Sequence, residues 1–173
     1  MFRDARKCAG LSREEAAFRI KVATKSLSNY EDGKTVPGPD VVIGMSREYG
    51  RPDITQRYCR EYCPIGARYG YIHLDNISMN LSDIWMKLRQ ELKEALAAIE
   101  AGEDIVINKR GPEDFTPAEW DELMLHTDQF MDVEHNIEIL KIRLGEMTDV
   151  SQLVSQHNQK MIDRGYARKG VSV

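Results

Sequence analysis

Over its first 60 residues the chain alternates short amphipathic stretches with residues that end helices. Apolar positions recur every three or four residues within each stretch, as on the buried face of a helix. Gly10, Gly33 and Gly50 suit the left-handed backbone that ends helices, and Pro64 with Gly66 breaks the last stretch. The pattern predicts helices over residues 2–9, 13–20, 24–33, 39–49 and 54–62.

The second and third predicted helices lie close together in sequence, joined by a short turn. Ser12 is a suitable N-cap and Glu15 completes a capping box. A shared core is predicted for Ala17, Ile20, Val22, Leu27 and Tyr30. Four polar residues are then left on the outer face of the third helix: Thr24, Lys25, Ser28 and Asn29. A helix, a short turn and a helix with a polar outer face form the helix-turn-helix pattern.

Residues 2–54 resemble the DNA-binding domain of Cro/repressor (XRE) helix-turn-helix regulators of bacteria and phages. The resemblance rests on matching residue types at matching spacing: Arg6, Gly10, Leu11, Ser12, Glu15, Ala17, Val22, Leu27, Ser28, Tyr30, Glu31, Gly33, Lys34 and Pro37. The sequence departs from the family at Lys21, where glycine is usual, at Arg13, where glutamine is common, and at Ala16, where leucine is usual. Its first helix is also short. The string YCREYCPIG is similar to a segment that follows this domain in Gram-positive regulators.

The resemblance implies a lambda-repressor-like fold that inserts the third helix into the DNA major groove. Thr24, Lys25, Ser28 and Asn29 are then the expected base contacts, since lysine can donate to guanine and asparagine can pair with adenine. Arg13, at the start of the second helix, and Lys34, just past the third, are the expected phosphate contacts.

The second half of the chain changes to long helical patterns. An apolar stripe predicts a helix over residues 81–99, with an interruption near Gly102. Thr116, Pro117 and Glu119 mark a helix start, with Phe115 against Trp120. The following heptad seam is Leu123, Phe130, Ile137 and Leu144 with His126, Val133, Leu140 and Met147. Its partner is the 81–99 helix, the same helix of a second chain, or both. Asp149 and Gln152 are expected to cap a last helix to residue 163, followed by a frayed tail, GYARKGVSV.

Charge divides between the two halves of the chain. Residues 1–70 carry 13 Lys and Arg against 9 Asp and Glu, whereas residues 71–173 carry 11 against 19. This asymmetry fits a DNA-binding front joined to a part that avoids phosphate, although two ordinary solvated surfaces would give it too. No apolar run is long enough for a membrane helix and no signal peptide is recognisable, so a soluble cytoplasmic protein is expected.

Metal and enzyme chemistry are weakly supported. Cys59 and Cys63 are four apart with His73 nearby, but a fourth ligand is missing, so packing thiols are favoured over a metal site. Three cysteines, the third being Cys8, make a disulfide framework improbable. Glu134 and His135 point in different directions on a helix and do not form a di-metal set. No cofactor is expected, and an enzyme is disfavoured because known catalytic motifs are absent.

These observations predict an all-α protein in three segments. Residues 1–54 form the helix-turn-helix domain, 55–77 a connecting helix and loop, and 78–173 an acidic helical hairpin or bundle for dimerisation or partner binding. The predicted function is sequence-specific binding, as a homodimer, to a near-palindromic double-stranded DNA operator, with repression as the favoured outcome. The alternative is a protein interaction adaptor or antitoxin-like protein, in which the helix-turn-helix is structural and the acidic half binds a protein partner.

Overall fold

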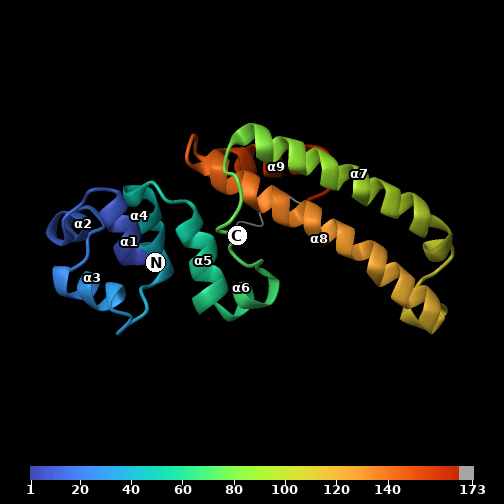
Figure 1. Cartoon of the computed structure of the whole chain (residues 1–173), viewed down its shortest axis with the longest axis horizontal. Helices are drawn as coiled ribbons and strands as arrows, with labels where there is room; N and C mark the ends of the chain where they lie inside the picture. Colours follow the sequence, from blue (N-terminus) through green and yellow to red (C-terminus); the bar gives the residue numbers. More distant parts are fainter. Residues whose placement is uncertain (168–173) are drawn as a thin grey trace. The chain divides into compact units, whose positions relative to one another are not determined.

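A computed structural model describes residues 1–167, and these residues form helices without any strand (Figure 1). The all-α fold class is therefore confirmed. The contacts divide the described residues into two compact units, one made of residues 1–73 with 144–167, and one of residues 74–143. The last helix is thus grouped with the first unit. The three-segment division made from the sequence placed it in the third segment, and that division stays a prediction.

Four helices form the start of the first unit: α1 (Phe2–Cys8), α2 (Arg13–Arg19), α3 (Thr24–Glu31) and α4 (Pro39–Tyr49). Their apolar faces meet in one core, continued by α5 (Asp53–Tyr62). Ala17 and Leu27 are fully buried there, and Ile20, Val22 and Tyr30 pack against them, as the sequence predicted. Other members of the core are Phe2, Ala5, Leu11, Ala16, Val42, Met45, Tyr49, Ile54 and Tyr58.

The N-terminus of α2 is capped by Ser12, whose hydroxyl accepts from the Glu15 N–H at 3.0 Å. The Glu15 carboxylate pairs with Arg19 at 2.5 Å and does not bond back to Ser12, so the reciprocal half of the predicted capping box was wrong.

The turn between α2 and α3 has a strained residue at its centre. Lys21 lies at φ +57°, in the left-handed region that favours glycine. The departure from glycine at this position therefore leaves the turn conformation intact and adds a conformational cost.

Helix α6 (Pro64–Tyr69) corrects the prediction that the chain breaks at Pro64 and Gly66. Proline occupies the first turn of α6, where its missing N–H costs nothing. Gly66 allows α6 to fold back closely on α5. A Cβ at this position would lie 2.2 Å from the Cys59 carbonyl oxygen, so only glycine fits there. The formation of α6 depends on its close packing against α5, and sequence spacing does not reveal that contact.

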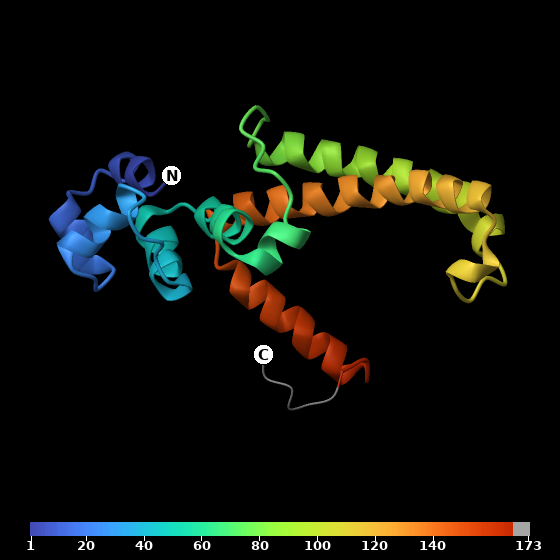
Figure 2. The same cartoon turned by 90° about the horizontal axis from the view of Figure 1, so that it is seen from below.

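In the second unit, α7 (Leu81–Val106) and the long helix α8 (Pro117–Gly145) lie side by side and antiparallel in both views (Figures 1 and 2). The predicted helical hairpin is therefore present. The predicted interruption at Gly102 is wrong, because α7 continues to Val106 with Gly102 buried against His126 of α8. A Cβ at Gly102 would meet the His126 ring at 3.5 Å, so a small residue allows the two backbones to approach.

The apolar stripe predicted on α7 divides between two faces of the helix. Ile84, Ala95 and Ala98 are buried in the hairpin together with Glu91. Trp85, Leu92, Leu96 and Ile99 are instead more than half exposed. One face of α7 therefore packs within the chain, and its apolar neighbour has no partner among residues 1–167.

The predicted start of α8 is confirmed in its contacts. The Glu119 carboxylate accepts from the Thr116 N–H at 2.7 Å, the Thr116 hydroxyl accepts from the Glu119 N–H at 3.3 Å, and Phe115 meets Trp120 edge to face at 5.4 Å. At α9 (Val150–Asp163) Asp149 is the N-cap as expected, with Ser151 as the donor. Residues 168–173 of the predicted frayed tail lie outside the described residues. No helix in residues 1–167 is long and apolar enough to cross a membrane.

Candidate nucleic-acid interface

The outer face of α3 presents four polar side chains that make no contact of their own with the rest of residues 1–167 by hydrogen bond or ion pair. Lys25 is exposed, and Thr24, Ser28 and Asn29 are partly exposed. None of these four side chains is engaged in a hydrogen bond or ion pair with another residue in the described part of the chain. Leu27, between them in sequence, is fully buried. Helix α3 therefore combines a side anchored in the core with a polar side whose donors and acceptors are available to a ligand.

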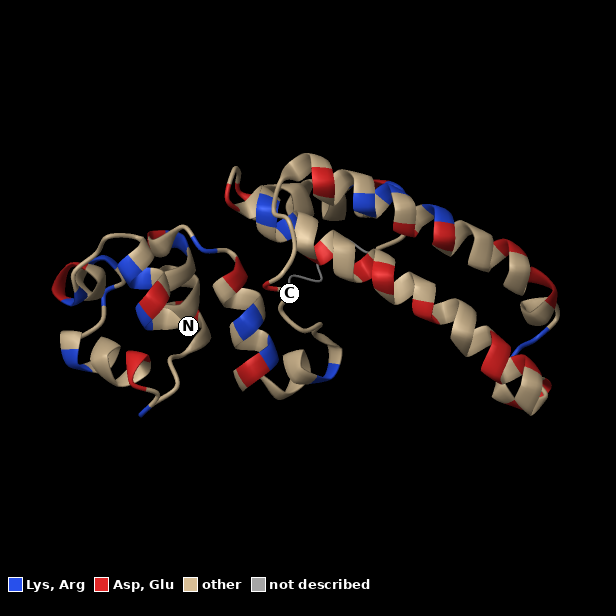
Figure 3. Ribbon diagram, in the orientation of Figure 1, with Lys and Arg blue, Asp and Glu red and all other residues tan. Residues whose placement is uncertain are grey.

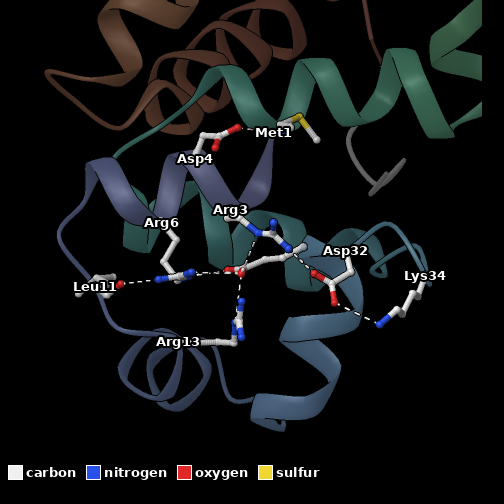
Figure 4. Close-up of polar contacts among 9 residues, drawn as sticks. Met1, Arg3, Asp4, Arg6, Leu11, Arg13, Asp32 and Lys34 are labelled. Atoms are coloured by element: carbon white, nitrogen blue, oxygen red, sulfur yellow. Dashed lines mark hydrogen bonds and ion pairs between the residues drawn. The ribbon is translucent and has the colours of Figure 1, made fainter.

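The end of α3 is anchored by Glu31, whose buried carboxylate contacts three arginines (Figure 4). Arg6 of α1 donates to both carboxylate oxygens, at 2.5 and 3.1 Å, and also to the Leu11 carbonyl oxygen at 2.7 Å. Arg13 of α2 donates to Oε2 at 3.2 Å, and Nε of Arg3 lies 3.9 Å from the same oxygen. We call Arg3, Arg6, Arg13 and Glu31 the Glu31 cluster. It ties α1 and α2 to the C-terminal end of α3 and so fixes the angle at which α3 is presented.

The arginines also determine the charge state of Glu31. Burial raises the pKa of the Glu31 carboxyl, but hydrogen bonds and charge from Arg6 and then Arg13 outweigh burial and hold that pKa below its usual range. Hydrogen bonding to Glu31 likewise raises the pKa of Arg6. Glu31 is thus ionised at neutral pH. Three guanidinium groups contact its carboxylate, and one of them, that of Arg3, is also paired with Asp32. The surplus positive charge on this side of the domain favours phosphate.

Tyr49 of α4 lies in the same electrostatic surroundings. Desolvation, and then the Glu31 charge, raise the pKa of the Tyr49 hydroxyl to about 12. This hydroxyl is buried and has no hydrogen-bond partner among the described residues. Tyr49 is therefore a neutral phenol whose contribution is the packing of its ring in the core.

The two expected phosphate contacts both lie beside acidic neighbours. Arg13 uses Nε for Glu31, with its side chain 36% exposed, which leaves its terminal nitrogens available at the start of α2. Lys34, past the end of α3, lies 3.3 Å from Asp32, and Asp32 is also paired with Arg3. Arg13 is thus positioned by the buried Glu31 carboxylate, whereas Lys34, with 64% of its side chain exposed, makes a single surface ion pair. Both cations lie near α3, a placement compatible with backbone phosphates on either side of a groove.

Sequence reasoning assigned no role to Arg3 and used Arg6 and Glu31 only as marks of resemblance. Their joint role depends on contacts between residues 18 to 28 positions apart. A signal was available in Arg6, a charged residue between apolar positions on the short first helix, where a buried charge requires a partner. The partner itself could be identified only in three dimensions.

The other predicted site residues lie outside this surface. Leu123, Phe130, Val133 and Leu140 of the heptad seam are half-buried on α8, as are His126 and Leu144, while Ile137 and Met147 are exposed. Cys59 and Cys8 are exposed free thiols and Cys63 is half-buried. Within residues 1–167 no group of three or more His, Cys, Asp or Glu side chains is placed to hold a metal ion.

Comparison with known proteins identifies the N-terminal helices. Residues 2–53 match the family model described as Helix-turn-helix, and no curated protein and no solved structure matches the chain. Helices α1 to α4 thus form a DNA-binding helix-turn-helix domain. This domain, residues 2–53, is of the Cro/repressor (XRE) type.

Proposed function

We propose that the protein is a transcriptional repressor that binds a near-palindromic operator as a homodimer in the cytoplasm. The observation that carries the proposal is the free polar face of α3, held at a fixed angle by the Glu31 cluster. A two-fold dimer carries two such helices, and two recognition helices about one DNA turn apart match a palindrome. Repression follows when the bound operator overlaps a promoter.

Within this proposal the predicted contact residues form two groups with different roles. Thr24, Lys25, Ser28 and Asn29 contact base edges and set the choice of sequence. Arg13 and Lys34 contact phosphates and set affinity and its dependence on salt. The two groups are distinguishable by experiment, because loss of a base contact changes specificity whereas loss of a phosphate contact weakens binding to all sequences.

The test begins with selection of bound fragments from the source genome, followed by titration of the selected duplex at several salt concentrations. Lys25→Ala and Asn29→Ala are expected to weaken operator binding by about 1–3 kcal/mol each and to relax specificity at particular base pairs. Arg13→Ala and Lys34→Ala are expected to weaken all duplexes and to reduce the salt slope by about one each. Lys160→Ala on the exposed face of α9 is the matched control and should change neither quantity.

Binding that is absent from every duplex, or that is unaffected by Lys25→Ala and Asn29→Ala, contradicts the proposed interface. A reporter placed downstream of the selected operator then tests the sign of regulation. Lower expression with the wild-type chain than with the Asn29→Ala variant is the result expected of a repressor.

A further inference from the structure

Helix α7 carries an exposed apolar stripe that its own hairpin does not cover. Trp85, Leu92, Ile99 and Val106 recur every seven residues and are 61, 51, 52 and 45% exposed, and Leu96, at 54%, lies between them on the same side. We call these five residues the α7 stripe. A shallow apolar hollow lined by Leu81, Ser82, Trp85 and Met86 lies at its N-terminal end. A continuous apolar surface of this kind marks an interaction site.

The spacing within the α7 stripe is that of a helix which packs along another helix. Positions 85, 89, 92, 96, 99, 103 and 106 alternate steps of four and three, the repeat of a coiled-coil seam. Five of these positions are apolar, and the remaining two are Arg89 and Glu103. The expected occupant is therefore a helix that supplies apolar groups together with one acidic and one basic group in the right order.

The charges on and beside the stripe are arranged symmetrically about Leu96. Arg89 and Glu103 lie seven residues on either side of it, and Lys93 and Glu100 lie three and four residues on either side. All four are exposed, and none forms an ion pair within residues 1–167. In contrast, Lys87 on another side of α7 is already paired with Glu91. Of these four groups the basic ones precede Leu96 and the acidic ones follow it. Figure 3 shows that Lys and Arg are confined to the N-terminal part of α7, where acidic residues also occur, and that its C-terminal end carries acidic residues alone.

We propose that the α7 stripe is the homodimer interface, and that two copies of α7 pack antiparallel with their two-fold axis at Leu96. This arrangement places Arg89 and Lys93 of each copy opposite Glu103 and Glu100 of the other, and Leu92 near Ile99. A parallel pair in register places Arg89 on Arg89 and Glu103 on Glu103, which like-charge repulsion disfavours. An interface between two identical chains related by a two-fold axis requires a patch that is complementary to itself. A surface for an unrelated partner has no such requirement.

The inference rests on the homodimer of the proposed function and names a surface for it other than the α8 heptad seam. That seam is half-buried on the helix that packs against α7 in the same chain. Of the α8 seam only Ile137 and Met147 are exposed, whereas all five residues of the α7 stripe are exposed and free to bury surface. Dimerisation through it requires no DNA, so it can be measured independently of operator binding.

The first experiment measures the mass of the full chain by sedimentation equilibrium in the absence of DNA. The wild type is expected at twice its 19.8 kDa chain mass. Arg89→Glu and Glu103→Arg each create like charges at both symmetric pairs and are expected to raise the dimer Kd by about tenfold or more. The double variant Arg89→Glu with Glu103→Arg restores opposite charges and is expected to dimerise with a Kd within about threefold of the wild type. Glu94→Arg, a charge reversal on the opposite side of α7, is the control and should leave the dimer intact.

A second experiment locates the two-fold axis by disulfide formation in a variant whose cysteines at 8, 59 and 63 are replaced by serine. Leu96→Cys is expected to cross-link two copies under oxidation, because the two side chains meet at the axis. Leu92→Cys is expected not to, because the two residues are then separated by about 12 Å along the helices. Cross-linking of both variants alike indicates a parallel pair and overturns the proposal.

A monomeric wild type overturns the inference and leaves the stripe to a different protein. Dimerisation unaffected by the single charge reversals, or not restored in the double variant, overturns it as well. If the protein forms the dimer but binds no operator, the proposed function is contradicted and this inference stands. If the protein binds its operator and the stripe variants remain dimeric, this inference alone is contradicted.

Discussion

The helix-turn-helix domain and the α7–α8 hairpin use similar helices with opposite outcomes for their apolar residues. In the domain, five helices share one core in which Leu27, Val42, Met45 and Ile54 are at most 1% exposed. In the hairpin, two long helices bury few side chains, and most of the large apolar residues of α7 remain exposed. Two helices alone can cover only one face of each other, so a third surface is needed to cover the rest.

The difference indicates that the two regions reach stability by different means. The domain is complete within the chain, because α1 to α5 surround its core and the Glu31 cluster joins three of those helices. The hairpin is incomplete within residues 1–167, because half of the apolar positions on α7 face outward. Substitutions at apolar positions should therefore act on folding in the first region and on association in the second.

The largest expected effect separates the two regions directly. Leu27→Ala removes a fully buried side chain from the domain core and is expected to cost about 4 kcal/mol of unfolding free energy. Leu92→Ala, the same change on a half-exposed stripe residue, is expected to cost less than about 1 kcal/mol in dilute monomer and to weaken the dimer. Hydrogen exchange of the α3 and α7 amides, measured at low and high protein concentration, checks both. Equal losses in the two helices would remove the distinction.

The next effect concerns the Glu31 cluster. Glu31→Gln leaves the buried Arg6 guanidinium without its counter-charge and is expected to destabilise the domain by about 3 kcal/mol. Denaturant unfolding at pH 7 measures this loss. Glu14→Gln, on the exposed side of α2, is the matched control and should change stability by less than about 0.5 kcal/mol. A loss of the same size in both variants would contradict a special role for the cluster.

The pH dependence of stability follows from the same group. Because the folded pKa of Glu31 is lowered, its contribution is fully present above the unfolded pKa of about 4.3 and is lost as pH falls through the folded value. The buried Asp53, whose pKa is also lowered because Arg51 outweighs its burial, acts in the same direction. Wild-type stability should therefore fall on acidification from pH 5, and the fall should be shallower in Glu31→Gln.

The smallest effect tests the strained turn between α2 and α3. Lys21→Gly is expected to stabilise the domain by up to about 1 kcal/mol, because φ +57° is costly for lysine and not for glycine. Part of this gain is offset by the greater freedom of glycine in the unfolded chain. Lys21→Ala keeps the strain and should give no gain, which separates the backbone effect from loss of the lysine charge. A thermal shift in the same direction for both variants would show that strain is not the cause.

Local patterns predicted the helices of the domain to within about two residues, since glycines, prolines and caps act on their immediate neighbours. Ser12, Thr116 and Asp149 were recognised as caps for this reason. The failures at Gly66 and Gly102 have the opposite origin. At Gly66 the backbone of α5 comes too close for a Cβ, and at Gly102 the His126 ring of α8 packs directly on the helix, and no local pattern records either neighbour.

The sequence by itself determined the helix-turn-helix pattern, the polar face of α3 and the periodicity of both long helices, because each depends on residue types a few positions apart. Only the tertiary structure decided which apolar positions of α7 are covered, since the adjacent Ile84 and Trp85 are both large and apolar, yet Ile84 is buried and Trp85 is exposed. It also decided that Glu31 gathers arginines from α1 and α2, because ion pairs form between charges that the fold brings together. The structure thus holds helix α3 by long-range charge pairs and leaves on α7 an uncovered stripe for which we propose a second copy of the chain as partner.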